Sequence, residues 1–302
     1  MSCFSGMYVK KSVPPVVSIR CHDGSIIVFV AFISDTGEYE SDGNVASHPS
    51  GAIFFRDLAS GRTRKLLENG KLSENATITS GYATLAFDSD GRFYLSGAGK
   101  IVVSNDDGKL FDIAADIDAQ QFVVTHDRRI YATEPGSGDA SGKVWMIQPD
   151  GHKTLIDSGL NHPSGIALSP DGLWLAVAEN KTHWGYSYRV ESDGTVQDKQ
   201  RFYWLHVPDT ADDSGVTTWA MDREGRLYAA TRMGVQVLDR NGRVRAILPL
   251  PAGQVTGLAF GGANFDTLYV GCADHKLYYR KLKVSGAPSW IRPITLPTWS
   301  PW

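Results

Sequence analysis

Residues 166–177 read Ile-Ala-Leu-Ser-Pro-Asp-Gly-Leu-Trp-Leu-Ala-Val, which is an apolar run, a polar turn at Asp171 and Gly172, and a second apolar run. Short apolar runs separated by Asp-Gly are typical of two strands joined by a hairpin, because Gly adopts a positive φ at little cost. The same unit recurs along the chain. Its plain copies are residues 85–95, 122–132, 166–177, 219–229 and 258–270, and a sixth copy opens the chain at residues 16–32.

The repeat predicts an all-β fold, a six-bladed β-propeller. Further strands follow several copies, each trailed by a turn such as Pro149-Asp150-Gly151 or Arg240-Asn241-Gly242. A single blade cannot bury its faces, whereas a ring of blades buries them and leaves only short edges. We expect an N-terminal arm (1–15), the propeller (16–285) and a Pro/Trp-rich tail (286–302). Three local expectations accompany this division: the strand Val16–Ile19 closes the ring beside the last blade, residues 35–50 form a polar loop insertion, and the tail wraps the outside.

Composition excludes several classes of protein. The formal net charge is −3, so no large basic field attracts nucleic acid or an anionic membrane. No stretch approaches the length of a membrane helix, and no signal peptide is visible, which predicts a soluble chain and leaves the compartment open. Three cysteines (Cys3, Cys21 and Cys272) are an odd number, which argues against a disulfide framework and favours a free, buried Cys272.

Candidate site residues follow from the propeller geometry, because first strands begin, and second strands end, at the same mouth of the channel. As catalytic residues we predict Glu134 and Glu179, since carboxylates in a cleft serve as acid or base. As substrate-binding residues we predict Arg232, Gln120, Ser164, Thr217 and Tyr82. Connections 181–184 and 206–214 could lean over the mouth. Asp209, Asp212 and Asp213 suggest a cation site by composition, but solvated turn aspartates are the simpler interpretation. The structural alternative for the charged residues is a Glu–Arg network that fixes blade register.

From about residue 118 to residue 283 the chain resembles the gluconolactonase, regucalcin and senescence-marker-protein family. The residues that carry the resemblance are 162–172 (His-Pro-Ser-Gly-Ile-Ala-Leu-Ser-Pro-Asp-Gly), 228–237 (Tyr-Ala-Ala-Thr-Arg-Met-Gly-Val-Gln-Val) and 258–270, with Leu-Ala-Phe-Gly-Gly and Thr-Leu-Tyr-Val. The resemblance implies a six-bladed propeller that hydrolyses sugar lactones with one calcium or zinc ion in its channel.

The metal ligands that the resemblance implies are replaced in this chain. Ser164 stands where the family has Asn, Thr217 where it has Asp, residues 83–85 (Ala-Thr-Leu) where it has Glu-Gly-Pro, and residues 119–121 (Ala-Gln-Gln) where it has Pro-Asn-Asp. Neutral hydroxyls are poor substitutes for a carboxylate ligand of a divalent ion. We therefore predict no metal ligand and no cofactor.

Two functions remain open from the sequence. The first is a gluconolactonase-like hydrolase of small sugar-derived lactones or esters, in which Glu134 or Glu179 is the base on water. The second is a catalytically degenerate, metal-free propeller that binds a small polyhydroxylated ligand or a protein. A structural module of a larger polypeptide is a further class, and the oligomeric state is left open.

Overall fold

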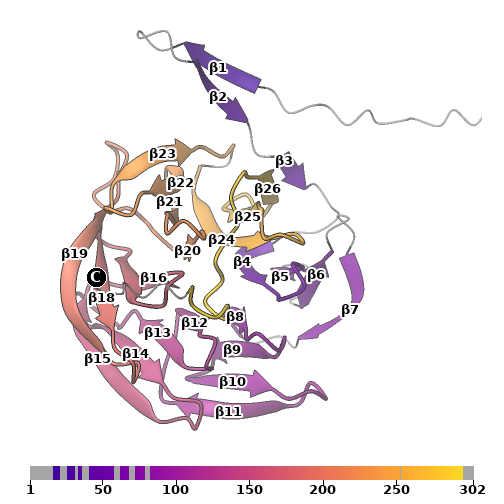
Figure 1. Cartoon of the computed structure of the whole chain (residues 1–302), viewed down its shortest axis with the longest axis vertical. Helices are drawn as coiled ribbons and strands as arrows, with labels where there is room; N and C mark the ends of the chain where they lie inside the picture. Colours follow the sequence, from indigo (N-terminus) through magenta and orange to yellow (C-terminus); the bar gives the residue numbers. More distant parts are fainter. Residues whose placement is uncertain are drawn as a thin grey trace, which may run out of the picture.

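The computed structural model describes residues 16–20, 26–30, 33–35, 41–57, 62–67, 72–78, 82–251 and 253–294. All regular structure in these ranges is β-strand: six four-stranded antiparallel sheets surround a central axis, and a separate two-stranded sheet lies outside the ring (Figure 1). The prediction of a six-bladed β-propeller is confirmed. The expected N-terminal arm (1–15) lies outside the described residues, as do Cys3 and Cys21.

The first five blades run outward from the axis in chain order. Blade 1 contains β4 (Ser41–Ser47), β5 (Ile53–Asp57), β6 (Thr63–Leu66) and β7 (Leu72–Ile78). Blade 2 contains β8 (Thr84–Phe87), β9 (Phe93–Gly97), β10 (Lys100–Ser104) and β11 (Leu110–Ala115). Blade 3 contains β12 (Gln121–Val124), β13 (Ile130–Glu134), β14 (Gly142–Ile147) and β15 (Lys153–Leu160). Blade 4 contains β16 (Pro163–Leu168), β17 (Trp174–Glu179), β18 (Trp184–Val190) and β19 (Val196–Trp204). Blade 5 contains β20 (Trp219–Met221), β21 (Leu227–Thr231), β22 (Gly234–Leu238) and β23 (Val244–Leu248).

Blade 6 closes the ring with strands from both halves of the chain. It contains β24 (Val255–Gly261), β25 (Thr267–Cys272), β26 (Leu277–Lys281) and, as its outermost strand, β3 (Ile33–Asp35). The expectation that Val16–Ile19 closes the ring is therefore wrong. That segment lies in β1 (Val16–Arg20), which pairs with β2 (Ile26–Val30) in a separate two-stranded sheet. The expected loop insertion at 35–50 is also wrong in part, because it contains β4, the innermost strand of blade 1.

The core lies between the blades. Six apolar clusters form among the described residues, and each joins two neighbouring blades. Alternate residues of a strand face opposite sides of a sheet, so each inner strand contributes to two clusters. Cys272 is free and buried at the end of β25, as predicted, and burial together with Asp274 raises the pKa of its thiol to about 12.

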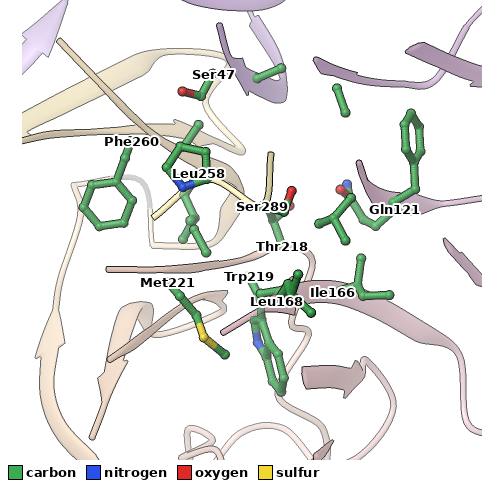
Figure 2. A pocket seen from close by; sticks show the side chains of 18 of the residues that line it. Ser47, Gln121, Ile166, Leu168, Thr218, Trp219, Met221, Leu258, Phe260 and Ser289 are labelled. Carbon is green, nitrogen blue, oxygen red and sulfur yellow. The ribbon is translucent and has the colours of Figure 1, made fainter. Parts of the chain in front are cut away.

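The two ends of the channel differ. We call the end where the innermost strands begin the mouth, and the end where they finish the turn face. Inner-strand side chains surround a small, mainly apolar cavity of about 130 Å³, and Ser289 lies among them (Figure 2).

No helix long and apolar enough to cross a membrane is present in the described part of the chain.

The tail crosses the turn face rather than wrapping the outside, which corrects the expectation for its described part, residues 286–294. Ala287 N donates to Met221 O (2.8 Å), and Ile294 N donates to Pro170 O (3.0 Å). Ser289 Oγ donates to Val124 O (2.7 Å). These bonds tie the tail to three blades. Trp299 and Trp302 lie outside the described residues.

Candidate functional site at the channel mouth

The structure places all seven predicted site residues at the mouth. Gln120 and Thr217 immediately precede the inner strands of blades 3 and 5, Tyr82 precedes that of blade 2, and Ser164 lies in β16. Glu134 and Glu179 are the last residues of β13 and β17, and Arg232 follows β21. Their side chains do not form one network, because each charged residue has its own partners.

Hydroxyl groups at the mouth join five successive blades, from blade 2 to blade 6. Thr84 Oγ1 donates to Gln120 O (2.6 Å), and Thr133 Oγ1 donates to Ser164 O (2.8 Å). Ser164 Oγ donates to Val216 O (2.7 Å), and Thr217 Oγ1 donates to Val255 O (3.4 Å). This relay, defined by Thr84, Thr133, Ser164 and Thr217, runs from blade 2 to blade 6. The protons of the Ser164 and Thr217 hydroxyls therefore point to backbone carbonyls.

Glu134 is held against the neighbouring strand of its own blade. Trp145 Nε1 donates to Oε2 (2.8 Å), Lys143 Nζ lies 3.5 Å from the same oxygen, and Asp118 N donates to Oε1 (3.4 Å). Burial acts to raise the pKa of Glu134, but these hydrogen bonds and the Lys143 charge outweigh it and lower the pKa. Such a carboxylate is a weak base and a good anchor for β14.

Glu179 is more deeply buried, with 3% of its surface exposed. Asn161 N donates to Oε1 (2.9 Å), and Thr182 Oγ1 donates to Oε2 (2.9 Å). Within the described chain, no cationic side chain lies within 4.0 Å of this carboxylate. The two carboxylates therefore differ in their partners, because Glu179 has neutral donors alone whereas Glu134 also has the ammonium group of Lys143.

Arg232 belongs to an ion-pair cluster that sequence reasoning assigned to solvated turn residues. Its Nε donates to Asp213 Oδ1 (2.9 Å), and Lys181 Nζ lies 4.0 Å from Asp213 Oδ2. Gly215 has φ +55°, and a Cβ there would lie 2.7 Å from Arg232 Cγ, so the loop approaches the arginine closely. The sequence marked Asp213 as a candidate cation ligand or a solvated turn residue, and its pairing with Arg232 was missed because the two residues lie 19 positions apart.

Backbone hydrogen bonds join the Glu179 turn to the Arg232 loop. Gly215 N donates to Asn180 O (3.2 Å), and Ser214 N donates to Thr182 O (3.2 Å). Arg232 N in turn donates to Ser214 O (3.2 Å). We call the resulting group the blade 4–5 corner; it consists of Glu179, Asn180, Lys181, Asp213 and Arg232. It gathers one buried carboxylate, one ion-paired carboxylate and two cations on one side of the mouth.

The donor groups at the mouth do not suit a divalent cation. Ser164 and Thr217 supply hydroxyls that already donate to carbonyls, and within the described residues no group of three or more His, Cys, Asp or Glu side chains gathers. Calcium and zinc sites are usually built from carboxylates, imidazoles or thiolates. That the protein works without a metal stays a prediction.

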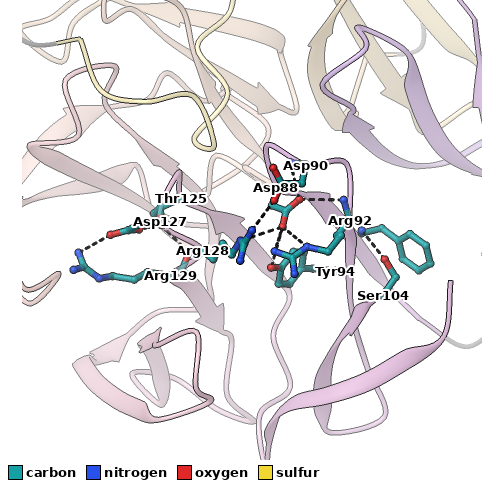
Figure 3. A network of polar contacts seen from close by, with 10 residues as sticks. Asp88, Asp90, Arg92, Tyr94, Ser104, Thr125, Asp127, Arg128 and Arg129 are labelled. Carbon is teal, nitrogen blue, oxygen red and sulfur yellow. Dashed lines mark hydrogen bonds and ion pairs between the residues drawn. The ribbon is translucent and has the colours of Figure 1, made fainter. Parts of the chain in front are cut away.

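The turn face carries a different polar network. In blade 2, Asp88 is fully buried; its Oδ1 accepts from Arg92 N (3.0 Å) and its Oδ2 from Arg92 Nε (2.9 Å) and from Tyr94 OH (3.3 Å), as Figure 3 shows. Burial, with the Asp88 charge, raises the pKa of Tyr94 to about 12. In blade 5, Asp222 holds Arg226 (Nε to Oδ2, 2.7 Å) and Tyr228 (3.2 Å) in the same way.

Comparison with known proteins identifies the family. The family model described as "SMP-30/Gluconolactonase/LRE-like region" matches residues 40–274. A pentonolactonase of Haloferax volcanii is 24% identical over 254 residues, which cover 80% of this chain and 84% of that protein. A gluconolactonase of Zymomonas mobilis is 25% identical over 201 residues, covering 62% of this chain and 55% of that protein.

Solved structures confirm the fold. The calcium-binding protein regucalcin of Agrobacterium tumefaciens superimposes with a TM-score of 0.71 at 17% identity, covering 89% of this chain and 98% of that one. A gluconolactonase of Xanthomonas campestris gives a TM-score of 0.66 at 20% identity, covering 90% and 99%. At these identities the likeness establishes the propeller alone.

Proposed function

The chain belongs to the SMP-30/gluconolactonase/LRE-like family, and from this premise we propose that it hydrolyses small sugar-derived lactones at the blade 4–5 corner of the mouth. The observation that carries the proposal is its similarity to a pentonolactonase along most of both chains. The substrate class is a small polyhydroxylated lactone, which matches the polar groups around the mouth.

Each corner residue has a distinct role in the proposed reaction. Glu179 takes a proton from water as the oxygen of that water bonds to the lactone carbonyl carbon. Arg232, oriented by Asp213, and Lys181 stabilise the negative charge that develops on the carbonyl oxygen. The ring C–O bond then breaks, and the departing alkoxide takes the proton that Glu179 received from water, which yields the open-chain hydroxy acid and restores the carboxylate.

The roles of the remaining predicted residues are narrower. To Tyr82 and Gln120, which precede the inner strands of blades 2 and 3, we assign contacts with the hydroxyls of the bound lactone. Ser164 and Thr217 support the site by holding blades together, since their protons are already donated. Glu134 is an anchor for Trp145 rather than a base.

The test is whether the purified protein hydrolyses glucono- and pentonolactones, with the released acid measured over time. The assay is run after EDTA treatment, then with added calcium, and then with added zinc. We expect Glu179→Gln to lower kcat by about 10²-fold and Arg232→Gln to lower kcat/KM by about 10-fold. Glu134→Gln is the matched control, because it changes the equivalent strand end in the preceding blade, and it should leave kcat unchanged.

Three results would count against the proposal. One is lactone hydrolysis no faster than in buffer under all three metal conditions, which would leave binding without turnover. Another is full activity in Glu179→Gln. The third is a loss in Glu134→Gln as large as that in Glu179→Gln, which would place the chemistry elsewhere on the mouth.

A further inference from the structure

A second cavity lies between blades 4 and 5 and opens on the turn face, at the other end of the blades from the mouth. Its volume is about 550 Å³, which is within the range of small-molecule sites. Tyr203 and Met221 are buried in its floor, Trp174 forms one wall, and Ile294 of the tail forms another. The tail therefore completes a pocket that the blades alone leave open.

Exposed apolar side chains gather at the rim of this cavity. Trp174 is 38% exposed and Ile294 is 49% exposed, and both line it. Leu173, next to Trp174, is 48% exposed. Large apolar groups that share one exposed site indicate a surface for binding rather than a chance of composition.

Two arginines face the same cavity without an acidic partner. Arg240 Nε donates to the backbone carbonyl of Glu224 (2.5 Å), which fixes its guanidinium beside the turn. Within the described chain, no carboxylate lies within 4.0 Å of Arg223 or Arg240. The acidic residue in the lining, Asp171, pairs with neither arginine, and its Oδ1 accepts from Ser169 Oγ (2.5 Å) and from Leu173 N (3.0 Å).

An apolar wall beside unpaired guanidinium groups suits an amphipathic anion. We propose that this cavity is a second ligand site, independent of the mouth, that binds an aromatic monocarboxylate. The aromatic body packs on Trp174 and Met221, and the carboxylate lies between Arg223 and Arg240, whose guanidinium groups donate in the planar geometry that carboxylates accept. The proposal does not depend on the lactonase assignment.

Calorimetric titration with naphthalene-2-carboxylate tests the site, and the neutral naphthalene-2-carboxamide is the matched ligand. We expect saturable binding of the carboxylate with Kd below about 1 mM. The double variant Arg223→Gln/Arg240→Gln should raise that Kd by at least about tenfold and change the Kd of the carboxamide by less than about twofold. Arg245→Gln, whose side chain is 70% exposed on the same blade, is the matched control. Glu179→Gln should also leave binding unchanged.

Several results would overturn the proposal. These are the absence of saturable carboxylate binding below about 1 mM, equal affinity for the carboxamide, and unchanged carboxylate affinity in the double variant. Competition by a lactone substrate would place the probe at the mouth instead. Binding that occurs only after removal of residues 295–302 would mean that the chain fills its own pocket, which also contradicts an external ligand site. Because Trp174→Ala removes the apolar wall, it should raise the Kd of the carboxylate and of the carboxamide by the same factor.

Discussion

The two ends of the channel are held by opposite kinds of chemistry. At the turn face, fully buried carboxylates such as Asp222 collect a guanidinium, a phenol and turn amides from their own blade. At the mouth, hydroxyls such as Ser164 donate to a carbonyl of the next blade. At the turn face, buried carboxylates therefore bind arginines within blades 2 and 5, and Arg128 of blade 3 also lies 3.8 Å from Asp88, whereas the hydroxyls at the mouth join neighbouring blades.

This difference helps to distinguish polar groups that stabilise the fold from polar groups that could bind a ligand. The charged modules at the turn face repeat in blades 2 and 5, which lie opposite each other in the ring, as expected for a structural device. At the mouth the charges are irregular: Glu134 faces Trp145, whereas Glu179 and Arg232 lie on one side. This irregular arrangement of charge supports the ligand site that we propose at the mouth.

The largest effect is expected at the turn face. Asp222→Ala removes the acceptor of Arg226 and Tyr228 and leaves buried donors unpaired, so the free energy of unfolding should fall by about 3–5 kcal/mol. Urea denaturation measures the change. Glu224→Ala, in the same turn with a side chain 62% exposed, is the control and should cost less than about 0.5 kcal/mol. A loss below about 1 kcal/mol in Asp222→Ala would mean that the module is dispensable.

The tail should also contribute to the stability of the propeller at the turn face. A Cβ at Gly286 would lie 2.3 Å from Phe260 Cβ, so Gly286→Val forces the tail or blade 6 to move, at a cost of about 2 kcal/mol. Gly138 has no atom within 4 Å of its Cβ position and no positive φ, so Gly138→Val is the matched control. Equal melting temperatures for the two variants would show that the tail does not brace the ring.

A smaller effect is expected from the relay at the mouth. Ser164→Ala removes one hydrogen bond to Val216 O, which still accepts from Asn180 Nδ2 (2.7 Å), so unfolding should become easier by about 1 kcal/mol. Adding Asn180→Ala leaves that carbonyl without either donor, and the double variant should lose more than the sum of the two singles. If the losses of unfolding free energy in the two single variants add up to the loss in the double variant, the two donors act independently on the Val216 carbonyl. The exposed Ser158→Ala is the control.

The sequence predicted the ring because the repeat combines two robust signals, the strand period and Asp-Gly turns. It failed at the closing strand because residues 16–32 carry the same pattern as a blade and pair as their own hairpin. The true closing strand, β3, pairs with β26 through only three residues, Ile33–Asp35. A strand that short has too little pattern to distinguish it from a loop.

For the site, the sequence located strand ends but not the direction of side chains. A shift of one residue in register moves a side chain to the other face of a sheet. Because the sequence does not give this register, it could not distinguish the surroundings of Glu134 from those of Glu179. Contacts between distant segments decided the outcome: Trp145 lies 11 residues beyond Glu134, and Asp213 lies 19 residues before Arg232. The tail was unpredictable for the same reason, since composition alone did not indicate which face it would cover.

The smallest effect concerns Glu134, and it sharpens the contrast between the two mouth carboxylates. The pKa of Glu134 is lowered from its ordinary value of 4.5, because the hydrogen bonds from Trp145 and Asp118 and the Lys143 charge outweigh burial. A carboxyl whose pKa is lower in the folded state stabilises the protein above its unfolded pKa, and this contribution is lost as the pH falls through the folded pKa.

The melting temperature of the wild type should therefore fall on acidification from about pH 5 to about pH 3. In Glu134→Gln the amide oxygen keeps the Trp145 bond but does not titrate, so the decline should be shallower over that window, with a slightly lower melting temperature at neutral pH. The exposed Ser158→Ala, which removes no titratable group, is measured in parallel and should follow the wild-type curve. Parallel curves for wild type and Glu134→Gln would show that this carboxylate is not linked to folding.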